Sequence, residues 1–111
     1  MTETPGAGRQ AYGDIAPALG DYTDGVLFGD LWKRPDLSPR DRSLATISAL
    51  IALYRHNELG FHVRKGLENG LTREEIIELI THMAFYAGWP VANTAIGVVR
   101  AIFSEQADPA Q

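Results

Sequence analysis

A glutamate and a histidine stand four residues apart in the stretch NELGFHVRKGLENG, which runs from Asn57 to Gly70. On a helix, Glu58 and His62 would share one face, and their side chains would meet. A carboxylate in that position can fix the tautomer of the imidazole and raise its pKa, which suits a general acid near neutral pH. The spacing is also consistent with two polar residues on a solvated face, so the pair is a hypothesis that the wider sequence must decide.

A histidine and a tyrosine repeat this spacing further along the chain, at His82 and Tyr86. Both would lie beside an apolar helix face rather than on it. A histidine in such a position is more often a structural residue than a catalyst, and the tyrosine suits packing better than acid chemistry. A role in lining a pocket is the functional alternative.

Metal and thiol chemistry have little support in the sequence. The three histidines, His56, His62 and His82, do not have the spacing of a metal site, and the zinc-protease motif H-E-x-x-H is absent. The chain has no cysteine, which excludes disulfides, thiolate catalysis and cysteine-based metal sites. We therefore expect neither a metal nor a cofactor.

The composition indicates a folded, acidic domain. The chain has 111 residues, of which 45% are hydrophobic, and a net charge of −4. Such a surface argues against nucleic acid as a partner, because phosphate binding depends on clustered Lys and Arg. No apolar run reaches the roughly 20 residues of a membrane span, and no secretory signal is evident. We expect a cytoplasmic protein with no membrane partner.

Apolar periodicity and helix boundary signals predict an all-α fold of about five to six helices. Pro39 at a first helical position, Asn57 as a cap, Thr72 with Glu75 as a capping box, and Gly70 after a helix end are the main signals. The predicted helices cover approximately 17–32, with a possible break near Gly25, then 39–54, 57–69, 72–87 and 91–105. We expect a flexible arm at 1–13, a single domain at 14–105 and a tail at 106–111.

Two of these predicted helices are too apolar for a lone monomer. The stretch RSLATISALIALY has little polar face, and the last helix is rich in Ala and Gly. Contiguous exposed apolar surface usually marks an interface, so we expect a homo-oligomer. A tightly packed five-helix monomer is the alternative.

The motifs FGDLWKRPDLSPRDRSLATISAL and NELGFHVRKGLENGLTREEIIELITHMAFYAGWPVANTAIGVV together resemble the carboxymuconolactone decarboxylase family, over about residues 15–103. The family is all-helical and forms trimers or hexamers. One branch resembles the AhpD-like alkyl hydroperoxide reductases and uses a C-x-x-C pair followed by histidine. Arg55 and Glu58 stand at the two cysteine positions here, with His62 in the histidine place, so the resemblance to the cysteine-free decarboxylase branch is closer.

That resemblance implies decarboxylation of 4-carboxymuconolactone or a similar small carboxylated lactone in aromatic catabolism, by the β-ketoadipate pathway, without a cofactor. Loss of carbon dioxide would send electrons through the ring alkene into the lactone carbonyl. The protein must bind a dianion, stabilise an oxyanion and return one proton to carbon. Other readings are a cofactor-free lyase, isomerase or cyclase acting on another small carbonyl compound, as in natural-product biosynthesis, or a non-enzymatic oligomeric binding protein.

The resemblance also assigns roles to residues. His62 would be the general acid and Glu58 would orient it. Arginine suits carboxylate binding because its planar guanidinium can donate two hydrogen bonds at once. Solvation of Arg42 in a first helical turn, and packing of Trp32 as a core or interface anchor, are the plain alternatives. The expected substrate-binding residues are Arg42, Arg34, Trp32, His82 and Tyr86.

Overall fold

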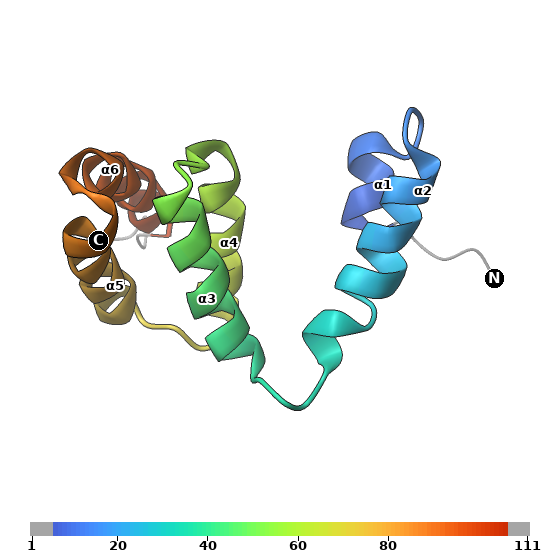
Figure 1. Ribbon diagram of the computed structural model, residues 1–111, viewed down its shortest axis with the longest axis horizontal. Helices are drawn as coiled ribbons and strands as arrows, with labels where there is room; N and C mark the ends of the chain where they lie inside the picture. Colours follow the sequence, from blue (N-terminus) through green and yellow to red (C-terminus); the bar gives the residue numbers. More distant parts are fainter. Residues whose placement is uncertain (1–5, 107–111) are drawn as a thin grey trace. The chain divides into compact units, whose positions relative to one another are not determined.

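The computed structural model describes residues 6–106, and all the regular secondary structure in that range is helical (Figure 1). The all-α prediction is therefore confirmed. The chain divides into two compact units, residues 1–38 and 39–111, which we call the N-terminal unit and the C-terminal unit. The boundary at Ser38 lies inside the single domain expected at 14–105. The elements are α1 (Ala7–Tyr12), α2 (Pro17–Asp21), the π-helix η1 (Tyr22–Leu27), the 3₁₀-helix η2 (Leu31–Lys33), α3 (Pro39–Ala52), α4 (His56–Glu68), α5 (Arg73–Ala87) and α6 (Trp89–Glu105).

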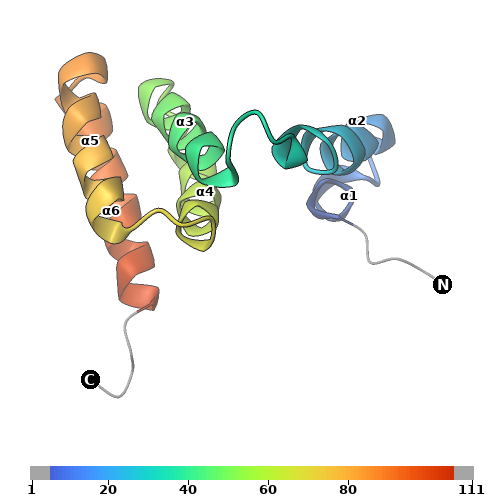
Figure 2. The same ribbon diagram turned by 90° about the horizontal axis from the view of Figure 1, so that it is seen from below.

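The C-terminal unit is a bundle of four helices, α3 to α6, packed side by side (Figures 1 and 2). Each helix presents an apolar stripe inward, at the spacing of three and four that the sequence shows. Stripes from all four helices meet in one core, which is the physical reason for the stability of the bundle. The core side chains are Ile47, Ile51, Leu59, Val63, Leu71, Ile76, Ile80, Ala84, Ala92, Ala95, Val99 and Ile102.

The junctions between α3, α4 and α5 depend on local backbone geometry. Helix α3 begins at Pro39, as predicted. The prediction of Asn57 as the cap of α4 was wrong, since Arg55 occupies the N-cap and Asn57 lies in the first turn. Gly70 follows the end of α4 with a φ of +109°, in the left-handed region that favours glycine. Beside it, the Asn69 amide donates to the buried hydroxyl of Ser43 at 3.0 Å, which ties the end of α4 to α3.

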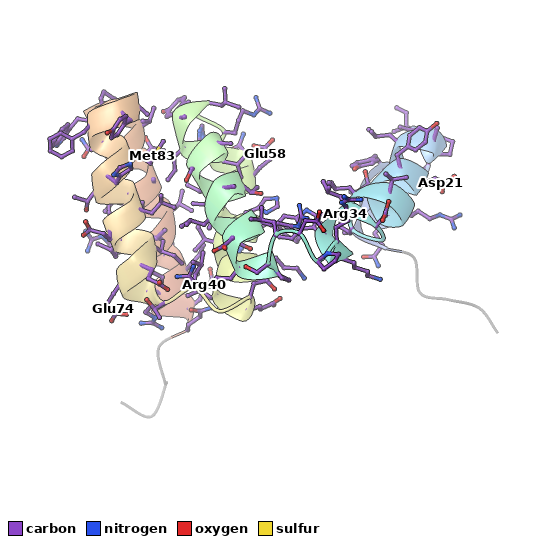
Figure 3. The ribbon with its side chains drawn as sticks, turned by 60° about the horizontal axis from the view of Figure 1, so that its bottom comes forward. Asp21, Arg34, Arg40, Glu58, Glu74 and Met83 are labelled. Atoms are coloured by element: carbon purple, nitrogen blue, oxygen red, sulfur yellow. The ribbon has the colours of Figure 1, made fainter. Side chains whose placement is uncertain are left out.

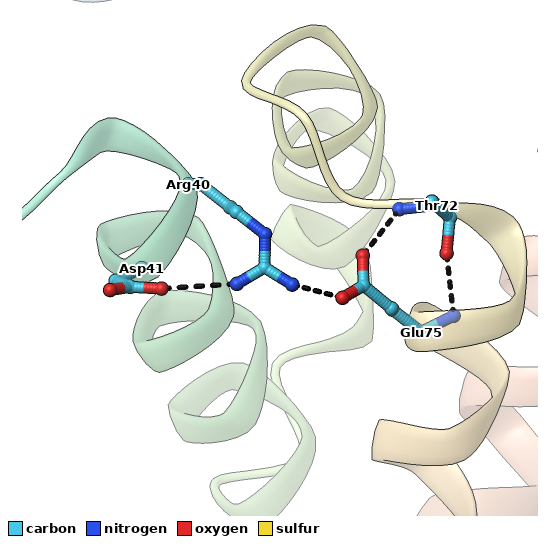
Figure 4. Close-up of polar contacts among 4 residues, drawn as sticks. All are labelled: Arg40, Asp41, Thr72 and Glu75. Atoms are coloured by element: carbon cyan, nitrogen blue, oxygen red, sulfur yellow. Dashed lines mark hydrogen bonds and ion pairs between the residues drawn. The ribbon is translucent and has the colours of Figure 1, made fainter.

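The start of α5 confirms the predicted capping box. The backbone N–H of Glu75 donates to the Thr72 hydroxyl at 3.0 Å, and the Thr72 N–H donates back to the Glu75 carboxylate at 2.9 Å. Arg40 of α3 then joins this carboxylate to Asp41 (Figure 4). The next helix, α6, begins at Trp89, earlier than the predicted start at residue 91, because Pro90 is tolerated in a first helical turn.

The N-terminal unit differs from its prediction. The expected arm at 1–13 contains α1, whose first N–H groups are capped from outside the helix. The Asp24 carboxylate accepts from Gly8 N at 2.8 Å and Arg9 N at 3.0 Å, and this long-range cap was not visible in the local sequence. The predicted single helix over 17–32 is instead α2, η1 and η2 in succession. Residues 1–5 of the arm and 107–111 of the predicted tail lie outside the described residues.

Within residues 6–106, no helix is both long enough and apolar enough to cross a membrane.

Candidate functional site

His62 is a half-buried titratable side chain on α4, a helix that packs against α3 and α6. The Phe61 ring lies edge-on to the imidazole, with centroids 5.0 Å apart and planes at 85°. Burial lowers the pKa of His62 below the ordinary value, and the positive charge of Lys65 lowers it further. The expectation that a carboxylate raises this pKa is therefore wrong, and burial together with the Lys65 charge favours the neutral imidazole.

Glu58, the predicted partner of His62, forms an ion pair with Arg55. The guanidinium of Arg55, the N-cap residue of α4, donates to the carboxylate of Glu58 at 2.9 Å, and both side chains are exposed (Glu58 is labelled in Figure 3). Arginine and glutamate thus interact at the two positions where the thiol branch of the resembling family has its cysteines. The role of Glu58 in orienting His62 stays a prediction.

Arg42 lies near the start of α3, the helix that packs against α4, and is partly buried. Its carbonyl accepts from the Thr46 hydroxyl at 2.8 Å, a bond within α3. The partial burial differs from that of a fully solvated first-turn residue, which was the plain alternative for Arg42. Its role as a carboxylate ligand stays a prediction.

Trp32 and Arg34 belong to the N-terminal unit. Trp32 lies in η2, with its ring 6.1 Å from that of Phe28 and tilted by 36°. Arg34 is exposed, lies 3.9 Å from the Asp36 carboxylate and lines an apolar groove of α2, η1 and η2. Because the two units are described separately, the predicted grouping of these residues with His62 stays a prediction.

His82 and Tyr86 share one face of α5, as their spacing predicted. Their rings are stacked, with centroids 4.7 Å apart and planes at 26°. Both are exposed, Tyr86 to 78%, and a second exposed pair consists of Phe85 near the end of α5 and Trp89 at the start of α6. The α5 end of the C-terminal unit therefore presents an aromatic surface, and the proposed pocket-lining role of His82 and Tyr86 stays a prediction.

Sequence reasoning missed two neighbours that set the properties of His62. Phe61 shapes one side of the imidazole, and Lys65 supplies the charge that disfavours its protonation. Lys65 stands three residues after His62, a spacing that places it on the same helix face. This spacing was available in the sequence, but the contribution of burial was not. Among residues 6–106, no three His, Asp or Glu side chains gather in a way that could hold a metal ion.

Comparison with known proteins assigns the chain to a family. The model of the carboxymuconolactone decarboxylase family matches residues 17–101, which extend from the start of α2 into α6. The chain belongs to the carboxymuconolactone decarboxylase family.

Two relatives show how the chain compares with particular members. A protein named 4-carboxymuconolactone decarboxylase from Acinetobacter baylyi (strain ATCC 33305 / BD413 / ADP1) is 42% identical over 85 residues, which cover 77% of this chain and 63% of the relative. A protein named nitrosuccinic acid decarboxylase npaB from Metarhizium robertsii (strain ARSEF 23 / ATCC MYA-3075) is 36% identical over 81 residues, which cover 73% of this chain and 57% of the relative. The chain thus spans less than two thirds of the length of these relatives.

Proposed function

We propose that this chain is a carboxy-lyase that needs no cofactor and acts on 4-carboxymuconolactone or a similar small carboxylated lactone. The observation that carries the proposal is the 42% identity to a protein named for that activity. The half-buried imidazole of His62 on α4 supports it, since the reaction needs a group that can hold and deliver one proton.

In the proposed reaction, the bond between the ring carbon and its carboxylate breaks. The electron pair moves through the ring alkene to the lactone carbonyl oxygen, and carbon dioxide leaves. Partly buried Arg42 would hold a substrate carboxylate with two parallel N–H bonds. A proton must then return to a ring carbon to complete the product.

The lowered pKa of His62 shapes the proton step. In the free protein, burial and the Lys65 charge lower the pKa of His62 and so disfavour the protonated imidazole before substrate arrives. A substrate dianion close to the ring would favour the imidazolium form, because an opposite charge raises the pKa of a base. His62 would therefore take up one proton from solvent as the substrate binds and deliver it to the ring carbon after carbon dioxide leaves. It would then be neutral again, as it was before the substrate bound.

Incubation with 4-carboxymuconolactone, followed by carbon dioxide release and loss of the lactone, tests the activity. We expect turnover by the wild type and a fall in kcat of about 10²–10⁴-fold in His62→Gln, the range for loss of a general acid. His56→Gln is the matched control, since His56 lies on the same helix and is exposed. Wild-type inactivity would refute the substrate, whereas full activity in a folded His62→Gln variant would refute only the role of the histidine.

The role of Arg42 has its own control on α3. Arg42→Gln should raise KM by about 10-fold or more, because a charge-assisted pair with a carboxylate contributes roughly 1.5–3 kcal/mol. Arg40→Gln should leave KM near the wild-type value, since Arg40 already bonds Asp41 and Glu75. Equal effects of the two substitutions on KM would argue against carboxylate binding by Arg42.

Nitrosuccinic acid is a second candidate substrate, favoured by the 36% identity to the protein named for its decarboxylation. The chemistry is related, because a nitro group next to the departing carboxylate can accept the electron pair as the lactone carbonyl does. Parallel assays of carbon dioxide release from both compounds distinguish the candidates. We expect a higher kcat/KM for the lactone, and the reverse order would reassign the substrate.

A further inference from the structure

Three side chains that can carry charge lie in one row along α4. Arg55 at the N-cap, Glu58 and His62 stand at positions i, i+3 and i+7, and this spacing places them on the same face of a helix. At 1.5 Å per residue, about 10 Å of helix axis separates Arg55 from His62. A small dicarboxylate and an arginine side chain together cover that span, so one ligand can reach both ends of the row.

The backbone before α4 holds Arg55 in a fixed place. The N–H of Arg55 donates to the Leu50 carbonyl at 2.8 Å, and the N–H of Tyr54 donates to the Ile51 carbonyl at 3.1 Å. Tyr54 has a φ of +57°, in the left-handed region where glycine is usual after a helix, and its ring lies 4.9 Å from that of His56. A bulky residue in this region is strained, and such strain is commonest at functional sites. The arginine therefore starts from a rigid turn tied to the end of α3.

The ion pair between Arg55 and Glu58 can exchange its carboxylate for another one. The Arg55 Nη2 donates to the Glu58 Oε1 at 2.9 Å, and an ion pair of this kind on a helix surface holds its partners weakly. The planar guanidinium has five N–H donors and matches any carboxylate with two parallel bonds. A carboxylate from a ligand can thus take the place of Glu58.

Charge balance connects this exchange to the proton on His62. With a neutral imidazole, the charges of Arg55 and Glu58 cancel, so the row is neutral. A ligand carboxylate would leave one negative charge in excess unless a proton enters with it. Glu58, once displaced, stands one turn before His62 and favours the protonated imidazole. Binding of one carboxylate together with one proton keeps the row neutral.

We propose that Arg55 binds the second carboxylate of the substrate by exchange with Glu58, and that the released Glu58 then stabilises the protonated form of His62. Arg42 is already assigned to the first carboxylate of the dianion. The inference rests on the proposed function, because it takes from it a dianionic substrate and a proton donor at His62. It adds Arg55 as a ligand, and it makes arrival of the substrate the event that loads the proton.

Other charged groups near the row have different partners or the wrong sign. Lys65, on the same face of α4, disfavours protonation of the imidazole and lies 3.5 Å from the Glu68 carboxylate. From α6, Glu105 is paired with Arg64 at 2.7 Å. From α3, the helix on the other side of α4, comes the arginine assigned to the first carboxylate. Glu58 is therefore the carboxylate of the row that can support the imidazolium.

Binding of an unreactive dianion tests the role of Arg55. The saturated lactone dicarboxylate lacks the ring alkene, so it cannot lose carbon dioxide by the proposed route. In calorimetric titrations of the full chain, Arg55→Gln should raise its Kd about 10-fold or more, and Arg55→Lys should recover only part of the loss because an ammonium group cannot form the two parallel bonds.

Arg64→Gln is the matched control, because it removes a similar ion pair from another face of the same helix and should leave Kd unchanged. A wild type that does not bind the dianion, or a folded Arg55→Gln variant that binds it as the wild type does, would overturn the inference.

Competition by Glu58 can be measured where no proton can enter. In a His62→Gln background, Glu58→Gln should lower the Kd of the saturated lactone several-fold, because it removes the carboxylate that competes for Arg55. Arg55→Gln should raise Kd in the same background. Opposite shifts from the two members of one ion pair are the signature of exchange. Shifts in the same direction would mean that the pair has only a structural role.

Proton uptake tests the second half of the proposal. Calorimetry in two buffers of different ionisation enthalpy gives the number of protons bound with the dianion, at a pH above the ordinary histidine value of about 6.5. The wild type should take up a fraction of a proton, Glu58→Gln should take up less, and His62→Gln should take up none. Equal uptake by the wild type and Glu58→Gln would refute loading by Glu58.

The two proposals fail in different ways. Binding that depends on Arg55, without turnover of the unsaturated lactone, would refute the proposed reaction and leave the arginine as a dianion ligand. Turnover by the wild type at a KM that Arg55→Gln does not change would refute the exchange and leave the reaction.

Discussion

The two units use apolar residues at similar helical spacing with opposite outcomes. In the C-terminal unit, stripes on α3, α4, α5 and α6 face one another, and twelve apolar side chains become buried. In the N-terminal unit, the apolar side chains from Ile15 to Leu31 have no buried apolar counterpart among the described residues of that unit. Periodicity therefore shows which face of a helix is apolar. Whether that face becomes buried within its own unit depends on how many other apolar helix faces can pack against it.

Truncation of a core residue should cause the largest loss in the free energy of unfolding. It should also show most clearly how the two units differ. Ile47→Ala removes a fully buried side chain and should lower the free energy of unfolding by about 2–5 kcal/mol. Leu19→Ala, at a half-exposed side chain of the N-terminal unit, should cost less than about 1 kcal/mol at concentrations where the chain is monomeric. Urea unfolding of both variants measures the difference. Equal losses in monomers would mean that Leu19 is buried within the chain.

Glycine substitutions test how the N-terminal unit holds together, since residues 6–38 bury no large apolar side chain. A Cβ at Gly8 would lie 2.6 Å from the Thr23 Cβ, so Gly8→Ala should separate α1 from η1 at a cost of about 1–3 kcal/mol. The loss should appear as faster amide hydrogen exchange in α1. Gly97→Ala, where the added carbon meets nothing within 4 Å, should instead stabilise α6 by about 0.5–1 kcal/mol. Unchanged exchange in α1 of Gly8→Ala would show that this close approach is not required.

The capping carboxylate of the C-terminal unit, Glu75, should make the stability of that unit sensitive to acid. Hydrogen bonds from the Thr72 backbone, then the nearby Arg40 charge, lower the pKa of Glu75. A carboxylate with a lowered pKa contributes stability that is present above its unfolded pKa and is lost as the pH falls through the folded value. Glu75→Gln should therefore flatten the acid limb of the stability curve of the C-terminal unit.

Glu74→Gln is the control for this acid limb, because Glu74 is an exposed neighbour in the same first turn of α5. Asp24→Asn should act instead on α1 in the N-terminal unit, by weakening the cap on Gly8 and Arg9. Thermal unfolding across the acid range, with amide hydrogen exchange in α1 and α5, distinguishes the effect of Glu75→Gln on α5 from that of Asp24→Asn on α1. An acid limb that Glu75→Gln leaves unchanged would contradict the lowered pKa.

The smallest expected effect concerns His62 of the C-terminal unit. Because burial and Lys65 lower its pKa, the unfolded chain binds more protons between the folded value and about 6.5, so stability rises with pH across that window. His62→Gln should remove this slope. Nuclear magnetic resonance titration of the imidazole should give a midpoint below 6.5, and Lys65→Gln should move it upward. A midpoint at or above that ordinary value would restore the original expectation of a raised pKa.

Much of the C-terminal unit could be predicted because its signals are local. Thr72 and Glu75 cap α5 through bonds that span three residues, and Gly70 ends α4 through its own φ. The N-terminal unit was harder to predict because Asp24 caps α1 from 16 residues away. Asn57 failed as a cap because the turn after α3 lets α4 begin at His56.

The candidate site was predicted only in part. Spacing correctly placed His82 and Tyr86 on one face of α5, and it placed Glu58 and His62 one turn apart on α4. It did not reveal that Arg55 pairs with Glu58, or that burial lowers the pKa of His62. Several partners compete for a carboxylate on a helix surface, and spacing alone does not rank them.

The sequence by itself determined the helical class, most helix ends and the exclusion of thiol chemistry, because propensity, capping and composition act over a few neighbouring residues. Tertiary structure alone decided that the chain divides at Ser38, that four helices of the C-terminal unit share one apolar core, and that the pKa of His62 moves down. Burial and desolvation depend on which helix faces meet in space, and that is a property of the whole packed chain.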